Sequence, residues 1–419
     1  VSAGGNDPVA WRDFGNALKN IGEAEAAADK YAVASRLAPK SGHLGSALLL
    51  GSTFLQSEST ASLGQRARET AERYCTGEAS RPVHPGSLNT FGFYSPRFSE
   101  GPIASLILPV LKELKALGYR LVLFSGFDHE SEITPSFREV AERFIAVHEM
   151  DNSEFGRIVQ EEGVSVLFDL CGQLPGNRLE ALAQRLAPIQ ISWGDWFLTT
   201  GIPAMDYFIG DPVANPPEED KYYSEKVLRL PRCRFAFDLP ADAPEINAHP
   251  PRDIMYGSFN RLSKLTEATL HAWVQILEET PSARLLLRAE GFEQESLRDY
   301  TSNRFAKHGI NSERLLFQSF SSYEEALQNY AMVTVALDPF PFNGCVTTFD
   351  ALRMGVPVVA LQGNSPVARQ SASILTALDL KDWVASDIDS YVERAVALSE
   401  AGLNDSARKQ LIARQSHLV

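Results

Sequence analysis

From about residue 90 onward, short apolar runs alternate with stretches of helical periodicity, and this alternation limits the possible folds more than any other feature. Parallel strands covered by helices on both faces are expected to give such a pattern. In the first half, the runs expected to be strands are FGFYS, YRLVLFS, FIAVH, VSVLFDL, PIQISW and DYFIGD. After the proline-rich passage at 238–253, they are IMYGSFN, RLLLRA, RLLFQSF, MVTVALD and VPVVAL. We therefore predict an α/β chain with two Rossmann-like sheets.

Two such sheets in one chain predict a cleft between them, because ligands of open parallel sheets bind beyond the carboxyl ends of the strands. Sugar-nucleotide transferases of the GT-B kind are built this way, and so are two-domain binding proteins and epimerases. The predicted parts are a helical segment at 1–80, a first lobe at 86–245, a second lobe at 246–395 and a C-terminal helix at 396–419.

The helical segment carries the spacing of a tetratricopeptide repeat. The positions that agree with this repeat are Trp11, Phe14, Gly15, Leu18, Ala27, Tyr31 and Pro39. Gly22 is expected at the turn between the two helices, and Pro39 is expected to end the second. An ordinary helical hairpin is the alternative, but the agreement in residue type and spacing favours the repeat. A single repeat cannot bury its own faces, so either it packs on the next part of the chain or more repeats lie upstream.

Composition narrows the range of partners. The 419 residues carry a net charge of −14 without a Lys/Arg-rich block, which argues against nucleic acid and anionic membranes. No apolar run approaches the length of a membrane span. The four cysteines lack metal-ligand spacing and are too few for a disulfide framework. We expect a cytoplasmic protein.

The stretch FNGCVTTFDALRMGVPVV, residues 342–359, predicts a phosphate site. Thr347 and Thr348 would open a helix, where unpaired N–H groups and the helix dipole favour an anion. Asn343 and Gly344 would let the backbone come close to it. Asp350, one turn further on, could accept a hydrogen bond from a ribose hydroxyl. The simpler alternative is that Thr347 only caps the helix.

A second element, YGSFNRLSKLTEATLHAW, places Asn260, Arg261 and Lys264 after a strand of the same lobe. Lys264 could reach a diphosphate there and neutralise the charge that develops on a leaving nucleotide. Taken alone, such a lysine is more commonly an ordinary solvated side chain, and the nearby threonine pair is what favours the phosphate role.

The chain resembles the O-GlcNAc transferase family over nearly its whole length. The matching strings are FNRLSK, LDPFPFNGCVTTFDALRMGVPVVAL and SPVARQSASIL in the second lobe, and GNRLEALAQRLAPIQISW and GIPAMDYFIGDPVANPP in the first. The resemblance implies a GT-B fold preceded by a tetratricopeptide array. It implies that Lys264 contacts the donor diphosphate, that Thr347 and Thr348 contact phosphate, and that Asp350 recognises the ribose.

The resemblance also implies that Asn260 and Arg261 line the donor pocket and that Gln318 and Phe320 lie near the base. It places the nucleotide-sugar in the second lobe and the acceptor across the cleft in the first. We expect no cofactor besides the nucleotide-sugar, whose carrier could be UDP, GDP or CMP. We expect the chain to lack the Asp-x-Asp motif of metal-dependent transferases, and we therefore predict no metal.

Several family positions are altered. Gly101 stands where the family has a histidine before proline, and Gln173 and Ala326 replace two further histidines. Val346, which precedes the threonine pair, replaces a fourth. The glycine-rich loop of bacterial relatives appears as GDWFLTTG at 194–201, a segment that could hold the sugar. Either the enzyme transfers a different sugar, or the chain is a catalytically silent scaffold that binds protein. Retention of the phosphate-binding residues favours transfer.

The predicted function is thus an inverting, metal-independent protein O-glycosyltransferase acting on Ser or Thr of a polypeptide, bound partly by the tetratricopeptide segment. Bacterial relatives of this architecture include enzymes that modify flagellin, some with CMP-linked nine-carbon acidic sugars. Transfer onto a lipid or polysaccharide is a further alternative. For the catalytic base we name Glu100, His129 and Asp195, although a residue in such a position is more commonly a solvated loop residue.

Overall fold

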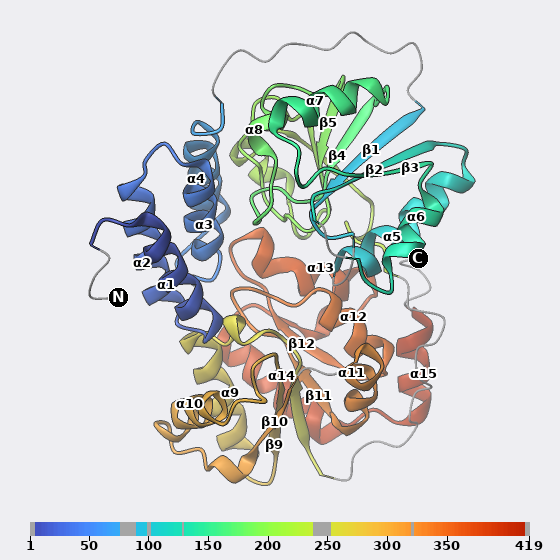
Figure 1. Cartoon of the computed structure of the whole chain (residues 1–419). Coiled ribbons are helices and arrows are strands. Elements are labelled where there is room, and N and C mark those ends of the chain that lie inside the picture. Colours follow the sequence, from blue (N-terminus) through green and yellow to red (C-terminus); the bar gives the residue numbers. More distant parts are fainter. Residues whose placement is uncertain are drawn as a thin grey trace.

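The computed structural model describes residues 5–75, 89–98, 102–127, 130–237, 253–319 and 322–414. Its elements form a helical segment and two lobes, each built on a parallel sheet (Figure 1). Two facing Rossmann-like lobes behind a helical segment confirm the predicted GT-B architecture.

The helical segment contains α1 (Pro8–Asn20), α2 (Ala24–Leu37), α3 (Gly42–Ser52) and α4 (Thr60–Ala71). Gly15 lets α1 and α2 approach closely, because a Cβ there would lie 2.8 Å from the Tyr31 ring. Gly22 makes the turn with φ 88°, a conformation that favours glycine. The second helix ends at Leu37, two residues before Pro39. The two packed helices and the turn that the tetratricopeptide spacing predicts are confirmed.

The first sheet has the strand order β3-β2-β1-β4-β5-β6-β7, and every neighbouring pair is parallel. The strands are β1 (Thr90–Ser95), β2 (Arg120–Ser125), β3 (Arg143–Ala146), β4 (Val166–Asp169), β5 (Ile189–Ser192), β6 (Tyr207–Gly210) and β7 (Lys226–Arg229). The helices are α5 (Pro102–Ala116), α6 (Thr134–Val140), α7 (Asn152–Glu161), α8 (Leu179–Leu182) and the 3-10 helix η1 (Pro217–Tyr222). The sequence missed β7, whose alternating polar residues fit its place at the edge of the sheet.

The second sheet has the order β10-β9-β8-β11-β12-β13 and is also parallel. Its strands are β8 (Met255–Ser258), β9 (Arg284–Arg288), β10 (Leu315–Gln318), β11 (Val335–Leu337), β12 (Val358–Leu361) and β13 (Val384–Ala385). Its helices are α9 (Glu267–Glu279), α10 (Glu295–Ala306), α11 (Tyr323–Asn329), α12 (Val346–Arg353), α13 (Gln370–Ala377), α14 (Ile388–Ala401) and α15 (Asp405–Arg414). Short 3-10 helices are η2 (Leu262–Lys264), η3 (Ser312–Arg314), η4 (Tyr330–Met332), η5 (Pro366–Arg369) and η6 (Lys381–Trp383).

The C-terminal range 396–419 is not one continuous helix. Helix α14 ends at Ala401, because Gly402 turns the chain with φ 60°, and α15 then packs against α12. The sequence also missed β13, which has only the residues Val384–Ala385.

The helical segment packs on both lobes, which is one of the two expected ways of covering its faces. Leu49, Leu63 and Ala67 share a buried cluster with Trp196 and Phe197 of the first lobe. On the second lobe, the Phe342 ring stacks on Phe54 of the segment, with ring centroids 4.7 Å apart. Figure 1 shows α1 to α4 running beside both lobes. Among the helices that the structure describes, none combines the length and apolar character needed to cross a bilayer.

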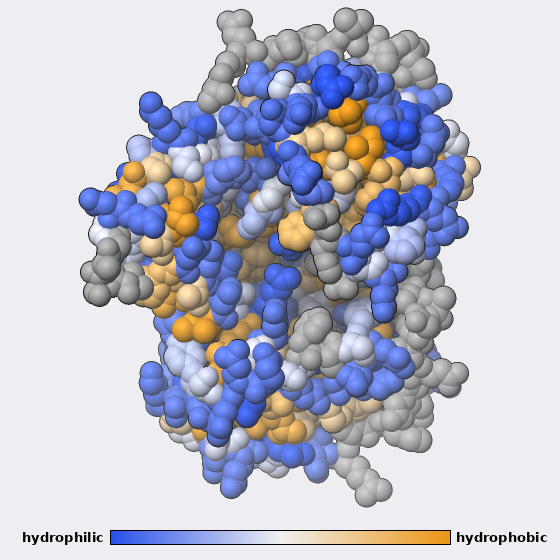
Figure 2. Space-filling view, in the orientation of Figure 1, coloured by the Kyte–Doolittle hydropathy of each residue, from blue (hydrophilic) through white to orange (hydrophobic). Residues whose placement is uncertain are grey.

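In both sheets the strand order reverses at one point. Strands β2 and β3 lie on one side of β1 and β4 on the other, and likewise β9 and β10 lie on one side of β8 and β11 on the other. Ligands of open α/β sheets bind outside the carboxyl ends of the strands at such a point. Figure 2 shows the surface hollowed between the two lobes, with a largely hydrophilic rim. The fold therefore directs attention to the residues that follow β1, β8 and β11.

Candidate functional site

The predicted phosphate site lies at the start of α12, which follows β11 through the loop 338–345. Thr347 and Thr348 occupy the first turn of the helix. The Thr347 hydroxyl donates to Asn260 Oδ1 over 3.1 Å, while the Thr348 hydroxyl lies 2.7 Å from that of Ser371. The N-cap residue is Cys345, and no side chain caps the helix. The simpler alternative of Thr347 as an N-cap is therefore wrong.

Gly344 is held between three oxygen atoms of this site. Its N–H donates to Asp338 Oδ1 over 2.6 Å. A Cβ at this position would lie 2.7 Å from Asp338 Oδ1 and from the hydroxyl oxygens of Thr347 and Thr348. The loop can thus approach the helix mouth only because residue 344 has no side chain.

We expect Gly344→Ala to weaken nucleotide binding at least about tenfold, because the added Cβ would displace these three oxygens. A loss of about 1.4 kcal/mol of binding free energy is enough for a tenfold change. The same variant should unfold at a lower temperature than the wild type. Isothermal titration with the nucleotide that binds the wild type measures the first effect. Gly5→Ala is the control, because a Cβ on Gly5 meets nothing within 4 Å. Equal affinity of Gly344→Ala and wild type would contradict this assignment.

Lys264 ends η2 and points its ammonium group to the same loop. Its Nζ donates to the Asn343 carbonyl oxygen over 2.8 Å and to Asn260 Oδ1 over 3.1 Å, and it lies 4.9 Å from the Phe342 ring centroid. An ammonium has three donors, so one remains for a ligand. Burial lowers the pKa of Lys264, while the nearby Asp338 carboxylate acts in the opposite direction. A bound phosphate would favour its charged form further.

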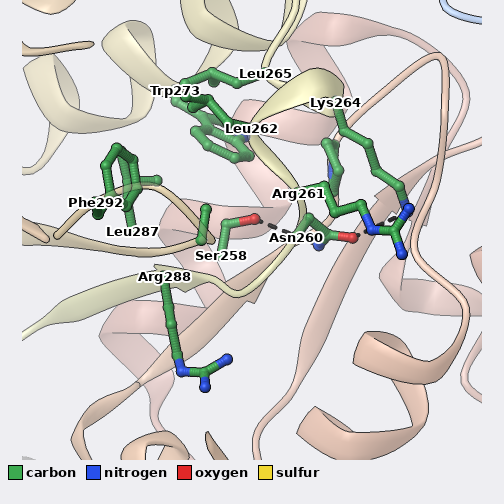
Figure 3. A pocket seen from close by; sticks show the side chains of 12 residues that line it. Ser258, Asn260, Arg261, Leu262, Lys264, Leu265, Trp273, Leu287, Arg288 and Phe292 are labelled. Atoms are coloured by element: carbon green, nitrogen blue, oxygen red, sulfur yellow. Dashed lines mark hydrogen bonds between the residues drawn. The ribbon is translucent and has the colours of Figure 1, made fainter. Parts of the chain in front are cut away.

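Asn260 links the two predicted elements, because its Oδ1 accepts from both Lys264 and Thr347. Figure 3 shows Asn260, Arg261 and Lys264 together beside a pocket that Ser258 and Arg288 also line. Arg261 is exposed, and its charge acts on Lys264. The structure therefore brings together the residues predicted after β8 and those predicted at the mouth of α12.

The predicted role of Asn343 is only partly compatible with its surroundings. Its side chain is fully buried and donates to the Pro339 carbonyl oxygen over 3.1 Å. The backbone carbonyl, by contrast, faces Lys264. Asn343 thus shapes the loop through its Nδ2 group and positions the lysine through its backbone carbonyl.

Asp350 lies buried one turn into α12, where Tyr323 donates a hydrogen bond of 2.6 Å to its Oδ1. Burial raises the pKa of Asp350 to about 7, and the Tyr323 hydrogen bond and the charge of Arg288 partly counteract that rise. A carboxylate oxygen remains available beside the tyrosine for the predicted ribose contact.

Because its native pKa of about 7 exceeds the value of about 3.9 in an unfolded chain, Asp350 makes stability fall as pH rises through this interval. We expect Asp350→Asn to remove that contribution, since the neutral amide keeps an acceptor for Tyr323. The free energy of unfolding of the variant, relative to that of the wild type, should rise by more than about 1 kcal/mol from pH 5 to pH 8, because one pKa unit corresponds to about 1.36 kcal/mol. Urea unfolding at both pH values measures this difference. A difference that stays constant, or that shrinks as pH rises, would contradict it.

Gln318, predicted near the base, ends β10. Its Nε2 donates to Asn329 Oδ1 over 3.3 Å, while its buried Oε1 has no hydrogen-bond partner among the described residues. An unpaired buried amide oxygen is a suitable acceptor for a donor group of a ligand. Phe320, the other predicted base contact, lies outside the described residues.

Of the three base candidates, Glu100 and His129 lie outside the described residues. Asp195 follows β5 in the first lobe, and burial raises its pKa to about 6. The positive charges of Arg97, Arg261 and Arg234 lower that pKa in part. Arg261 belongs to the second lobe, so a charge of that lobe acts on Asp195 of the first.

Internal hydrogen bonds occupy several polar side chains of the first lobe. Gln173, which replaces a family histidine, is buried, accepts from Ser46 of α3 and donates to the Thr200 carbonyl oxygen over 2.6 Å. The hydroxyls of Thr199 and Thr200 in the loop GDWFLTTG both donate to the buried carboxylate of Glu225. These contacts hold the helical segment and the loop in place, and they occupy the hydroxyls of Thr199 and Thr200.

The expectation that the sequence lacks an Asp-x-Asp motif is also wrong, because Asp387-Ile388-Asp389 has this spacing. Asp387 is the N-cap of α14, and its carboxylate accepts from the Ser390 N–H over 2.8 Å. The motif therefore has a local structural explanation.

Sequence reasoning missed several residues of the site. Asp338 directly follows β11 and organises Gly344, and its position at the end of the run MVTVALD was a usable signal. Tyr323 and Ser371 reach the site from α11 and α13, and Lys19 reaches the cleft from α1. Nothing in their local sequence indicates these contacts.

The two facing Rossmann-like lobes, with an ammonium and a helix mouth meeting at the switch point of the second, define a protein of the GT-B class. The chain belongs to glycosyl transferase family 41, whose family model matches residues 89–249 and 239–417. The substitutions at family histidine positions thus occur within a chain that the family model still matches over most of its length.

Individual relatives agree with this assignment. A probable UDP-N-acetylglucosamine–peptide N-acetylglucosaminyltransferase SPINDLY of Arabidopsis thaliana is 29% identical over 74% of this chain and 35% of its own length. The counterpart from Hordeum vulgare is 28% identical over 89% of the chain and 41% of its own length. The chain thus spans well under half of these relatives. The solved structure of a mutant O-GlcNAc transferase of Thermobaculum terrenum superposes with a TM-score of 0.92 at 28% identity, covering 99% of this chain and 80% of that one.

Proposed function

We propose that this chain is a protein O-glycosyltransferase that moves a sugar from a nucleotide-sugar to a Ser or Thr hydroxyl of a polypeptide. The observation that carries the proposal is the joint contact of Lys264 and Thr347 with Asn260, which places an ammonium at the mouth of α12. Family membership and the names of the relatives support the same reaction class.

In the proposed reaction, the acceptor oxygen bonds to the anomeric carbon as the bond from that carbon to the phosphate oxygen breaks. The nucleotide leaves with the electron pair, and its growing negative charge is stabilised by Lys264 and the first turn of α12. Attack from the side opposite to the phosphate inverts the anomeric centre. These residues supply positive charge without a metal ion, so the proposed transfer is metal-independent.

The acceptor hydroxyl must lose its proton, and we assign Asp195 as the base. Its carboxylate is on the acceptor side of the cleft and, with a pKa of about 6, is ionised at neutral pH. Arg261, from the donor side, acts on the same carboxylate. Asp195→Asn should therefore lower transfer while leaving nucleotide affinity unchanged.

The acceptor is proposed to be a polypeptide because the helical segment lies against both lobes at the cleft. Lys19, in the last turn of α1, is close enough for Arg97 and Arg261 to lower its pKa, although burial is the main cause of that shift. A peptide leaving the helical segment would thus reach the cleft directly. Flagellin is the acceptor that we would test first.

One observation favours an acidic sugar on a CMP carrier as a second candidate donor. Lys19, Arg97 and Arg261 come from three parts of the chain, yet none forms an ion pair within the described residues. Asp195 is the carboxylate on which Arg97 and Arg261 act. A carboxylate on the donor sugar would offset the remaining positive charge.

The test is thermal unfolding of the protein with UDP, GDP and CMP, followed by transfer assays with the matching nucleotide-sugar and purified flagellin. A nucleotide at 100 times its dissociation constant adds about 2.7 kcal/mol of stability. We expect one nucleotide to raise the unfolding temperature and its sugar conjugate to be transferred. Binding without transfer to flagellin or to a panel of unfolded polypeptides would favour the catalytically silent scaffold, and absence of both would overturn the donor site.

A further inference from the structure

Away from the cleft, three side chains with metal-binding atoms converge on the second lobe. Glu267 and His271 lie one turn apart on α9, and His308 follows the end of α10. One potential ligand atom from each of the three residues lies within 4.8 Å of the others. The two imidazole rings have centroids 4.5 Å apart and planes at 88°. Figure 1 shows α9 and α10 side by side below the helical segment.

The carboxylate of this group is already held in position. Arg304, whose side chain is only 4% exposed, donates from Nε and Nη2 to Glu267 Oε1 over 3.0 and 2.7 Å. One oxygen of the carboxylate is thus occupied, and the other remains. Carboxylates and imidazoles that bind metals are commonly oriented by such outer contacts, which strengthen the site.

We propose that Glu267, His271 and His308 bind a divalent transition-metal ion such as Zn²⁺. Two imidazole nitrogens and one carboxylate oxygen form a ligand set that suits Zn²⁺ better than Mg²⁺ or Ca²⁺, which prefer oxygen ligands. His271 and Glu267 are exposed and His308 is half-buried, so the ion can enter from solvent and keep a water molecule as its fourth ligand. The three residues take no part in the proposed transfer reaction.

The bound ion would join α9 to the end of α10 beside the contact with the helical segment. Arg304, which orients Glu267, also donates to the Ile21 carbonyl oxygen over 3.3 Å and to that of Leu265 over 3.0 Å. Leu265 directly follows Lys264 in the chain. The ion therefore stabilises a point where the helical segment, α9 and the lysine loop meet.

The experiment is titration of the chelator-treated protein with Zn²⁺ against a coloured indicator, together with the visible absorption of Co²⁺ as a report of the ligand set. We expect one ion per chain and a rise in the unfolding temperature. His271→Ala and His308→Ala should each bind at least about 100-fold more weakly, beyond the 10 to 100-fold typical of outer contacts. Glu267→Gln should bind more weakly as well.

His148→Ala is the matched control, because His148 is also exposed but lies in the first lobe. Its affinity should equal that of the wild type. Circular dichroism in the presence of chelator checks that all variants fold. The proposal is overturned if the His271 and His308 variants bind Zn²⁺ as tightly as the control, or if folded wild type shows no stoichiometric binding.

Discussion

Replacing Lys264 by alanine should lower the catalytic efficiency of sugar transfer by about 100 to 1,000-fold, the loss typical of removing one group that stabilises charge in a transition state. The ammonium is buried and already held by Asn260 and the Asn343 carbonyl, so it needs no reorganisation when the nucleotide leaves. Initial rates with the donor identified by nucleotide binding measure the effect. The stabilisation by that nucleotide should also shrink.

Two further variants separate the charge from the packing. Lys264→Met keeps an apolar stem against Phe342 and removes only the ammonium, so it should be as impaired as the alanine variant. Lys381→Ala, an exposed lysine of the same lobe, should keep full activity. Transfer by Lys264→Met at more than half of the wild-type rate would show that the ammonium has no part in the reaction.

Much of this site could be predicted because its residues follow strands. In a parallel sheet the carboxyl ends of neighbouring strands meet, so Asn260 after β8 and Gly344 after β11 must come close once both runs are recognised. The helix mouth at Thr347 was predicted on the same grounds, and the structure joins it to Asn260 by a hydrogen bond. The alternation of apolar runs and helices was sufficient for that inference.

The remaining contacts could not be read from the sequence because they join segments far apart in the chain. Gln173 replaces a family histidine, and its side-chain partner is Ser46 of the helical segment, 127 residues away. Thr199 and Thr200 have the residue types of a sugar site, yet Glu225 occupies both hydroxyls. The local sequence cannot show whether a threonine hydroxyl bonds to a buried carboxylate or faces a substrate, because tertiary packing decides between the two.

Removing the side chain of Arg369 should lower the free energy of unfolding by about 3 kcal/mol, the lower end of the range for breaking one side of a buried ion pair. Arg369, on η5 of the second lobe, donates to Glu219 on η1 of the first over 2.6 and 3.1 Å. It also donates to the Thr60 hydroxyl of α4 over 2.9 Å. One guanidinium thus joins all three parts of the molecule, and denaturant unfolding of Arg369→Ala measures its contribution.

The loss should come mainly from the carboxylate that is left behind. The side chains of Arg369 and Glu219 are 7% and 16% exposed, so Glu219 alone would retain only the Thr60 hydroxyl and little water. The double variant Arg369→Met with Glu219→Gln should therefore lose less stability than Arg369→Ala. Arg157→Ala, which breaks an exposed pair with Glu161, should cost no more than about 0.5 kcal/mol. If the double variant were less stable than Arg369→Ala, the unpaired Glu219 carboxylate would not be the main source of the loss.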